Sequence, residues 1–301
     1  MAVRLDAGGV ALARAALARV PFNTLFASHV LERAEAGDPA AAVMGDDAAD
    51  PRVFLVVHPN TMALMWSTGE PRPGWLAWLR DVALGRGGVV RAEPLWLQCH
   101  PSHEWDALLS GLVDIVPMGL VDLPAGAVWR SWRVNFEYSG GGLAAPAGAA
   151  ECGEGAVPAA GAAAATTAEA EDAPHVVRCD AELFGRMDGG TVPKAYWSSA
   201  DEFLRGGVGF CVLRGGRLSA TAFSGFRRGA LLEIGIETIP EFRGRGDAAR
   251  AVAALVEHCV SAGLEPIWAC RDSNVASYRL AERCGFREVL RVPYYRLPGG
   301  T

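Results

Sequence analysis

The sequence lacks the features of a membrane or nucleic-acid protein. No apolar run approaches the ~20 residues that a membrane-spanning helix needs, and Arg14 and Arg19 interrupt the apolar N-terminal segment, unlike the core of a secretory signal. A net positive charge is also missing, because 28 basic residues face 34 acidic ones and give −6 at pH 7. We therefore expect neither a membrane anchor nor a nucleic-acid partner.

Paired cysteines are missing as well. The seven cysteines are scattered along the chain, include no Cys-x-x-Cys pair and are odd in number. This pattern indicates reduced thiols in a cytoplasmic protein rather than a disulfide framework. A metal site built from Cys99, His100 and His103 is the alternative, but no further ligand stands out, so we expect no metal.

A change of composition divides the chain into three parts. Residues 139–174 are nearly all Ala, Gly, Pro, Thr and Glu, with no aromatic residue. Such a segment cannot bury enough apolar area to offset the entropy of ordering it. We therefore predict a flexible linker at 139–174, between an N-terminal α/β domain at 1–138 and a C-terminal domain at 175–301. In a chain of 301 residues that is half hydrophobic, both domains have ample material for a core.

Strand-like and helix-like segments alternate in the N-terminal domain. The apolar runs at 53–58 and 62–67 predict paired strands, and the apolar spacing at 74–85 predicts a helix that ends at Gly85. No phosphate loop or catalytic signature accompanies them. The pattern therefore predicts a small α/β unit without recognisable chemistry of its own.

The C-terminal domain has a clearer order of elements. A Gly-Gly turn at 215–216 predicts a hairpin, and Gly263 predicts the end of a long helix. The predicted segments, in chain order, are strands at 209–216, 217–229 and 231–239, a helix at 247–262, a strand at 266–271, a second helix and a last strand. This order predicts an α/β (α+β) fold, with a mixed, mostly antiparallel sheet flanked by helices.

A glycine-rich turn lies where the third of these strands meets the long helix. Gly244 and Gly246 alternate there with Arg243 and Arg245. The first N–H groups of a helix lack intrahelical partners, and the helix dipole makes that end partly positive, so an anion is favoured. Glycine lets the backbone approach a phosphate closely, and the arginines add positive charge. Together these residues predict a diphosphate site.

The spacing of the turn differs from two common phosphate loops. It is not Gly-x4-Gly-Lys-Ser/Thr, which disfavours a nucleoside triphosphate, and not Gly-x-Gly-x-x-Gly, which disfavours a dinucleotide. Arg243-x-x-Gly246-x-Ala248 instead resembles the pyrophosphate-binding motif of the GCN5-related N-acetyltransferase (GNAT) superfamily. A second segment, in which Asn274 and Ser277 open a pattern that ends at Gly-Phe 285–286, resembles the C-terminal helix signature of that superfamily.

A narrower resemblance points to the acetyltransferase group that includes the zwittermicin A resistance protein. It rests on the stretches EIGIET, EPIWAC and SNVASYRLAERCGF around the glycine turn. Proteins of that group similarly carry an extra N-terminal region. The order of elements in the N-terminal domain also fits a degenerate copy of the same GNAT-like fold.

The resemblance implies that acetyl-CoA, as co-substrate, donates an acetyl group to a primary amine of a small molecule by direct attack. In this fold one strand presents backbone groups to the cofactor, and the turn holds the diphosphate. The residues implied to bind the cofactor are Ile236, Thr238, Ile239, Arg243, Gly244, Arg245, Gly246, Asp247, Ala248, Asn274 and Ser277. We expect the Asp247 side chain to point to solvent, because facing inward it would repel a diphosphate.

Candidate catalytic residues lie on the strand before the turn and on the second helix. Glu233 and Glu237 share a face by alternation, and one could take the proton of the amine while the other binds a cationic acceptor. The alternative is that both are solvent-facing carboxylates. The tyrosine that many family members use as a general acid is replaced by Ala281, which leaves Tyr278 as the candidate donor. A thiolate can also leave without an acid.

Three functions stay open on these patterns. The first is an N-acetyltransferase of small-molecule amines. The second is a CoA-binding or regulatory module that has lost transfer, which the departures at Ala281 and Asp247 keep open. The third is a protein N-acetyltransferase, although nothing in the sequence marks a peptide groove. The acceptor and the oligomeric state are not encoded in these patterns.

Overall fold

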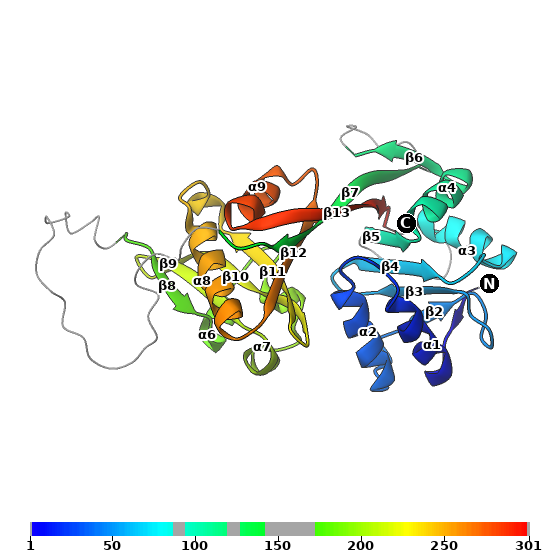
Figure 1. Ribbon diagram of the computed structural model, residues 1–301, viewed down its shortest axis with the longest axis horizontal. Coiled ribbons are helices and arrows are strands. Elements are labelled where there is room, and N and C mark those ends of the chain that lie inside the picture. The colour runs from blue at the N-terminus through cyan, green and yellow to red at the C-terminus, as the bar shows by residue number, and fades with distance from the viewer. Residues whose placement is uncertain (1, 87–93, 119–126, 142–171, 300–301) are drawn as a thin grey trace, which may run out of the picture. The chain divides into compact units, whose positions relative to one another are not determined.

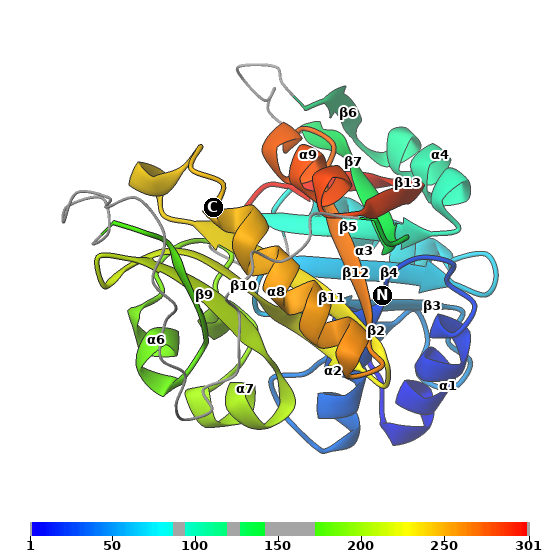
Figure 2. The same ribbon diagram turned by 60° about the vertical axis from the view of Figure 1, so that its left-hand side comes forward.

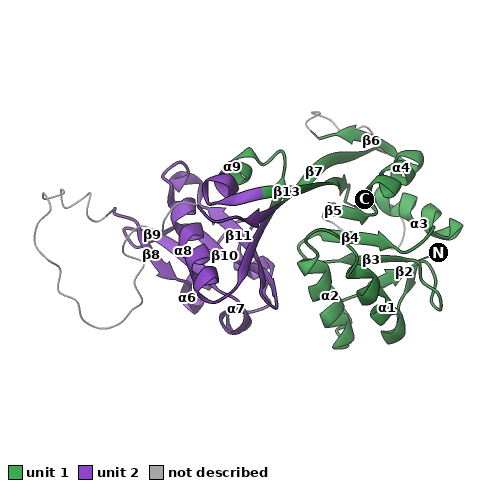
Figure 3. Cartoon of the chain, viewed as in Figure 1, with its two compact units in different colours: residues 1–135, 269–278, 288–301 green, residues 136–268, 279–287 purple. Residues whose placement is uncertain are grey.

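The computed structural model describes residues 2–86, 94–118, 127–141 and 172–299 (Figure 1). The chain forms two compact units (Figure 3): unit 1 comprises residues 1–135, 269–278 and 288–301, and unit 2 comprises 136–268 and 279–287. Most of the linker predicted at 139–174 lies outside the described residues. The predicted domain limits therefore stay predictions.

Unit 1 contains a sheet with helices packed on it. Its own elements are β1 (Val3–Arg4), α1 (Ala7–Leu17), α2 (Leu25–Glu35), β2 (Val43–Gly45), β3 (Val53–Val57), β4 (Met62–Ser67), α3 (Pro73–Ala83), β5 (Leu95–His100), α4 (Ser102–Leu112) and β6 (Asp114–Pro117). Four elements have residues in both units, namely β7 (Ala127–Tyr138), β12 (Glu265–Arg271), α9 (Val275–Arg283) and β13 (Phe286–Leu297). The predicted strands at 53–58 and 62–67 are confirmed as the antiparallel pair β3–β4, and the predicted helix at 74–85 is α3.

The strands of unit 1 pair mostly antiparallel. β1, β2, β3 and β4 are antiparallel neighbours, β4 pairs with β5 in parallel, and β13 pairs antiparallel with β5. A core of apolar and aromatic side chains fills this unit, and Trp75, Trp105 and Tyr295 are at most 1% exposed. Burial of this apolar area is the main source of stability for the unit.

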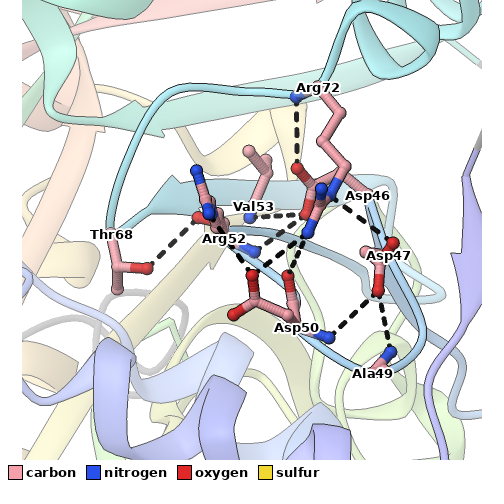
Figure 4. A network of polar contacts seen from close by, with 8 residues as sticks. All are labelled: Asp46, Asp47, Ala49, Asp50, Arg52, Val53, Thr68 and Arg72. Carbon is pink, nitrogen blue, oxygen red and sulfur yellow. Dashed lines mark hydrogen bonds and ion pairs between the residues drawn. The ribbon is translucent and has the colours of Figure 1, made fainter.

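A buried aspartate fixes the connection between β2 and β3 (Figure 4). Asp46 is 4% exposed. Its Oδ1 accepts hydrogen bonds from the backbone N–H groups of Arg52 (2.8 Å) and Val53 (3.1 Å), and its Oδ2 accepts one from the backbone N–H of Arg72 (3.2 Å). The carboxylate therefore joins the β2–β3 connection to the segment that begins α3.

We expect Asp46→Ala to destabilise the protein by about 2–4 kcal/mol, because it leaves backbone donors in a shielded corner without their acceptor. Urea unfolding measures this change. Asp50→Ala is the matched control: its side chain is 67% exposed and pairs with Arg72 at the surface, so its removal should cost less than about 1 kcal/mol. Equal losses for the two variants would contradict a structural role specific to Asp46.

A buried histidine makes the stability of unit 1 depend on pH. His58 is 3% exposed, and burial lowers its pKa from 6.5 to about 4. Between pH 6.5 and about pH 4, His58 therefore binds a proton in the unfolded chain but not in the folded chain. We therefore expect the contribution of His58 to stability to be complete above pH 6.5 and to be lost as the pH drops towards 4, by about 3 kcal/mol in all.

The melting temperature measured between pH 7.5 and 4.5 tests this expectation. His58→Asn removes the ionisable ring but keeps an acceptor for the Asn60 N–H, which donates to Nδ1 of His58 (3.2 Å). We expect a flatter pH profile for this variant than for wild type. His103→Gln serves as control, because the His103 side chain is 84% exposed. Identical pH profiles for wild type and His58→Asn would contradict the assignment of the pH dependence to His58.

Unit 2 carries the glycine turn. Its own elements are β8 (His175–Arg178), α6 (Ala181–Arg186), η1 (Pro193–Ala195), α7 (Ala200–Gly206), β9 (Gly209–Arg214), β10 (Arg217–Arg228), β11 (Leu231–Thr238), η2 (Pro240–Phe242) and α8 (Asp247–Ser261). Neighbouring strands from β8 to β11 pair antiparallel, and β11 pairs in parallel with β12. The predicted mixed, mostly antiparallel sheet flanked by helices is therefore confirmed.

Helices cover the two faces of the unit 2 sheet, and the alternation of β9 shows how. Phe210 lies 6.0 Å, between ring centroids, from His258 of α8. The next residue, Cys211, instead packs in a cluster with Phe203 of α7 and Phe184 of α6. Since successive side chains point to opposite faces, α8 covers one face of β9–β11 and the α6–α7 segment covers the other (Figure 2).

Candidate functional site

The turn between β11 and α8 depends on two glycines. Gly244 has φ +80° and Gly246 has φ +79°, a left-handed conformation that residues with a Cβ rarely adopt. A Cβ added to Gly244 would meet no atom within 4 Å. The turn therefore needs glycine for its conformation, and it has open space beside the backbone at Gly244.

The turn leads directly into the first N–H groups of α8. Gly246 is the N-cap of the helix, and no side chain caps it in the described part of the chain. The first i to i−4 hydrogen bond runs from Arg250 N–H to Gly246 C=O (3.2 Å). The N–H groups of Asp247, Ala248 and Ala249 precede this ladder, and the helix dipole places partial positive charge there. This geometry suits an anion.

The prediction that Asp247 points to solvent is wrong. The residue is 1% exposed. Arg214 donates to it from Nε (2.7 Å to Oδ2) and Nη2 (2.9 Å to Oδ1), and the Ser219 hydroxyl donates to Oδ2 (2.7 Å). Burial favours a raised pKa, but the hydrogen bonds from Arg214 and Ser219 hold the pKa of Asp247 below its ordinary value. The donors on β9 and β10 explain why the carboxylate turns to the sheet.

Guanidinium groups surround the turn. Arg243 and Arg245 are exposed. The guanidinium of Arg245 lies 5.3 Å from the ring centre of Phe242, and its Nη1 lies 3.4 Å from Asp172 Oδ2. Arg250 Nη1 donates to the backbone oxygen of Arg245 (3.3 Å). These contacts keep the guanidinium groups of Arg245 and Arg250 close to the helix N-terminus.

One edge of β11 directs backbone groups away from β10. The Ile239 N–H donates to the Ser219 C=O (2.9 Å). In an antiparallel pair the hydrogen-bonded positions alternate, so Ile236 and Thr238 direct their N–H and C=O groups to the opposite edge. In the described residues, the pairing with β12 reaches Glu233, opposite Ile267. The later part of β11 can therefore pair with an extended ligand.

The two candidate glutamates lie on one face of β11. Glu233 is 6% exposed, so the alternative of a solvent-facing carboxylate is wrong for it. Glu237 is half-buried, and its Oε2 accepts a hydrogen bond from the Thr191 N–H (3.0 Å). A Cβ at Gly235, between them, would lie 2.4 Å from Cζ of Phe223. The Phe223 ring therefore separates the two carboxylates.

The second motif begins at the start of α9, where Asn274, Ser277 and Tyr278 lie in unit 1. Asn274 Oδ1 accepts a hydrogen bond from the Ser277 N–H (3.2 Å), so Asn274 caps the helix. The Tyr278 hydroxyl donates to Glu288 Oε2 (2.7 Å), which also accepts from Arg291 (2.9 Å). The Arg291 hydrogen bond lowers the pKa of Glu288. These contacts organise α9 and β13 within unit 1.

The alternative metal site is not assembled. Cys99 is 1% exposed in the core, whereas the His103 side chain is 84% exposed and lies beside Glu104. Among the residues that the structure describes, no group of three His, Cys, Asp or Glu side chains is arranged to hold a metal ion. In the same residues, every helix is too short or too polar to cross a membrane.

Sequence reasoning missed the partners of the turn. Arg214 and Ser219 hold Asp247, and Asp172 reaches Arg245. Arg214 lies at the end of β9, 33 positions before Asp247 in the sequence, and no local pattern links the two. The only available signal was the predicted hairpin, which brings the β9–β10 turn next to the end of β11.

The fold and this turn define an α/β protein in which an uncapped helix N-terminus, in the described residues, lies at one end of a mixed sheet. Comparison with known proteins gives the family. Residues 167–295 match the family model described as GNAT acetyltransferase. The C-terminal part of this chain therefore matches the GNAT acetyltransferase family, as the sequence motifs predicted.

Relatives support the same assignment. The chain is 33% identical over 100 residues to an uncharacterised N-acetyltransferase, YdfB, of Bacillus subtilis; the match covers 33% of this chain and 38% of the relative. It is similar to a GCN5-related N-acetyltransferase-like protein of Streptococcus suis, with a TM-score of 0.63, 17% identity and coverage of 97% of this chain and 99% of the other. It is also similar to a GNAT-family acetyltransferase of Colwellia psychrerythraea, with a TM-score of 0.52, 11% identity and coverage of 99% and 100%. The two structures show a shared fold over nearly the whole chain.

Proposed function

We propose that this protein is an acetyl-CoA-dependent N-acetyltransferase that acts on a primary amine of a small molecule. The observation that carries the proposal is the start of α8. There, a turn with two left-handed glycines leads into N–H groups that no side chain caps, in the described part of a GNAT-family segment. A helix N-terminus of this kind favours a diphosphate.

The residues around the turn fit coenzyme A. The backbone from Gly244 to Ala248 would hold the diphosphate, and Arg243 and Arg245 would add charge. The open space beside Gly244 supports this placement, because a Cβ there would obstruct the approach of a phosphate. The outward edge of β11 at Ile236 and Thr238 would pair with the pantetheine arm, whereas the Ile239 N–H is already bonded to the Ser219 C=O of β10. When bound, acetyl-CoA would supply an acetyl group activated as a thioester.

Glu237 is the residue that we assign to proton removal. An amine attacks in its neutral form, so a carboxylate that accepts the ammonium proton promotes the reaction. Glu237 is half-buried and therefore reachable, and the Thr191 N–H fixes its Oε2. Glu233, at 6% exposure, is better suited to stabilise a cationic acceptor than to exchange protons with solvent.

The residues of α9 have secondary parts in this proposal. The cofactor-binding roles of Asn274 and Ser277, which the resemblance implies, stay predictions. Tyr278 is the candidate proton donor to the departing thiolate. Its hydroxyl already donates to Glu288 (2.7 Å). The CoA thiolate can also leave without an acid, because a thiol is far more acidic than an alcohol. We therefore expect Tyr278→Phe to slow the reaction only modestly.

We also propose a cytoplasmic location and membership of the zwittermicin A resistance protein-like group. The six cysteines among the described residues are buried and form no disulfide bond. This supports a reducing compartment.

The test is release of CoA thiol from acetyl-CoA in the presence of a panel of amines. We expect turnover with at least one small primary amine. Tight CoA binding without turnover on any amine or peptide would favour a regulatory module. Turnover restricted to peptide N-termini would favour a protein N-acetyltransferase. Absence of CoA binding by the wild-type protein would overturn the proposal itself.

A further inference from the structure

A buried ion pair ties the start of α8 to the sheet beneath it. The guanidinium fork of Arg214, at the end of β9, donates two hydrogen bonds to Asp247 (2.7 and 2.9 Å), and the Ser219 hydroxyl of β10 donates a third (2.7 Å). The side chains of Arg214 and Asp247 are 11% and 0% exposed. The first residue of the helix is therefore bound to two strands at once.

The geometry of this pair constrains the helix. A planar guanidinium that donates two bonds to one carboxylate fixes the orientation of both groups, unlike a single contact. Asp247 is the first residue of α8, so its position sets where the N–H groups of the first turn lie and point. A movement of that turn would break charge-assisted bonds in a buried setting, where an unpaired charge is costly.

The pair also neutralises the negative charge of Asp247 next to the proposed diphosphate site. A carboxylate at the first helical position would repel a diphosphate bound to the same turn. Arg214 neutralises it at contact distance, and Arg250 Nη1 lies 3.7 Å from Oδ1 of Asp247. The hydrogen bonds keep the carboxylate on the sheet side of the turn, and its charge is offset there.

Arg214 connects the helix start to the turn itself. Its Nη1 donates to the backbone oxygen of Asp172 (2.8 Å), and the carboxylate of Asp172 lies 3.4 Å from Arg245 Nη1. One guanidinium therefore contacts both Asp247 of the helix and the residue that holds an arginine of the turn. This arrangement links the first turn of α8 to the charged side of the candidate diphosphate site.

We propose that Arg214 and Asp247 are positioning residues for the diphosphate site: their side chains do not contact the ligand, but hold the N–H groups of α8 in the binding orientation. This narrows the expectation that Asp247 binds the cofactor, because only its backbone would do so. The inference rests on the proposed CoA site, and it assigns a function to the residue at the start of α8 whose direction was predicted wrongly from the sequence.

The decisive variant is Asp247→Asn, tested by isothermal titration with CoA. The two readings of Asp247 predict opposite signs. If the carboxylate mainly repels the diphosphate, its removal tightens binding. If it positions the turn, the amide weakens the fork with Arg214, and the Kd for CoA rises about tenfold. The matched control is Glu241→Gln, an exposed carboxylate beside the same turn, for which we expect a Kd within about twofold of wild type.

A double-variant cycle tests whether the two residues act as a unit. Arg214→Met should also raise the Kd for CoA, and the Arg214→Met/Asp247→Asn variant should be no worse than the poorer single variant, because the pair is already lost. Pantetheine, which has no diphosphate, should bind all of these variants as it binds wild type. A general loss of structure would weaken both ligands, so this comparison separates positioning from stability.

Milder variants keep the test decisive if Asp247→Asn does not fold. Ser219→Ala removes one hydrogen bond, and Arg214→Lys keeps the charge but loses the fork. We expect both to raise the Kd for CoA by about two- to fivefold. Unchanged or tighter CoA binding in every folded variant would overturn the positioning role. Failure of the wild-type protein to bind CoA would instead overturn the proposed function. This result differs from failure of the positioning role, in which wild type binds CoA and the variants bind it equally well.

Discussion

Gly246→Val is expected to abolish measurable CoA binding, with a rise in Kd of at least about 100-fold. Gly246 has φ +79°, a region in which a β-branched residue is a rare outlier. A Cβ at this position would also lie 3.2 Å from Arg250 Nη1. The turn would have to change its path, and the N–H groups that follow it would no longer converge on one anion. Isothermal titration with CoA measures the effect.

The matched control for this variant is Gly229→Val. Gly229 has φ +58° and open space around its missing Cβ, but it lies in the hairpin between β10 and β11, at the opposite end of β11 from the turn. It should suffer a similar backbone strain, on the order of 1–2 kcal/mol, and lose thermal stability without losing CoA affinity. If the two variants bound CoA equally well, the cofactor would not lie at the α8 turn.

Glu237→Gln is expected to lower kcat by about 100-fold while the Kd for CoA stays unchanged. The amide cannot accept the proton of the ammonium group, but its oxygen can still accept the hydrogen bond of the Thr191 N–H. The loop at 189–191 should therefore stay in place, and the loss should appear in the chemical step. Steady-state kinetics on the best amine of the panel provide the measurement.

Glu233→Gln is the comparison that separates the roles of the two carboxylates. Glu233 is assigned to stabilise a cationic acceptor, so its variant should raise the KM for the amine more than it lowers kcat. The opposite outcome, a loss of kcat only in Glu233→Gln, would exchange the two assignments. Normal kinetics in both variants would remove the carboxylates from the mechanism.

Local patterns in the sequence predicted the frame of unit 2. The hairpin at 215–216, the strand at 231–239 and the helix from 247 are set by residues that lie next to one another, so alternation, turn glycines and helix ends reveal them. The same holds for Asn274, whose capping bond to Ser277 spans three positions. The match to the GNAT family model follows from these short-range signals in the right order.

Contacts between distant segments could not be predicted in this way. The direction of Asp247 depends on Arg214, and the fixed carboxylate of Glu237 depends on a backbone N–H at Thr191. Neither partner has a sequence feature that marks it, because any strand end can carry an arginine and any loop has N–H groups. An aspartate at a helix start is usually exposed, and only the packed sheet reveals that this one is not.

The buried pair of Arg214 and Asp247 has a consequence for how this protein diverged from other sequences. Loss of either partner alone leaves a buried charge beneath α8 without its two-bond partner, so intermediate sequences with one substitution should be less stable. The two positions are then expected to covary: homologues with an apolar residue at the position of Asp247 should also lack an arginine at the position of Arg214. Homologues that carry one charge without the other would have to supply a new counter-ion from a neighbouring strand.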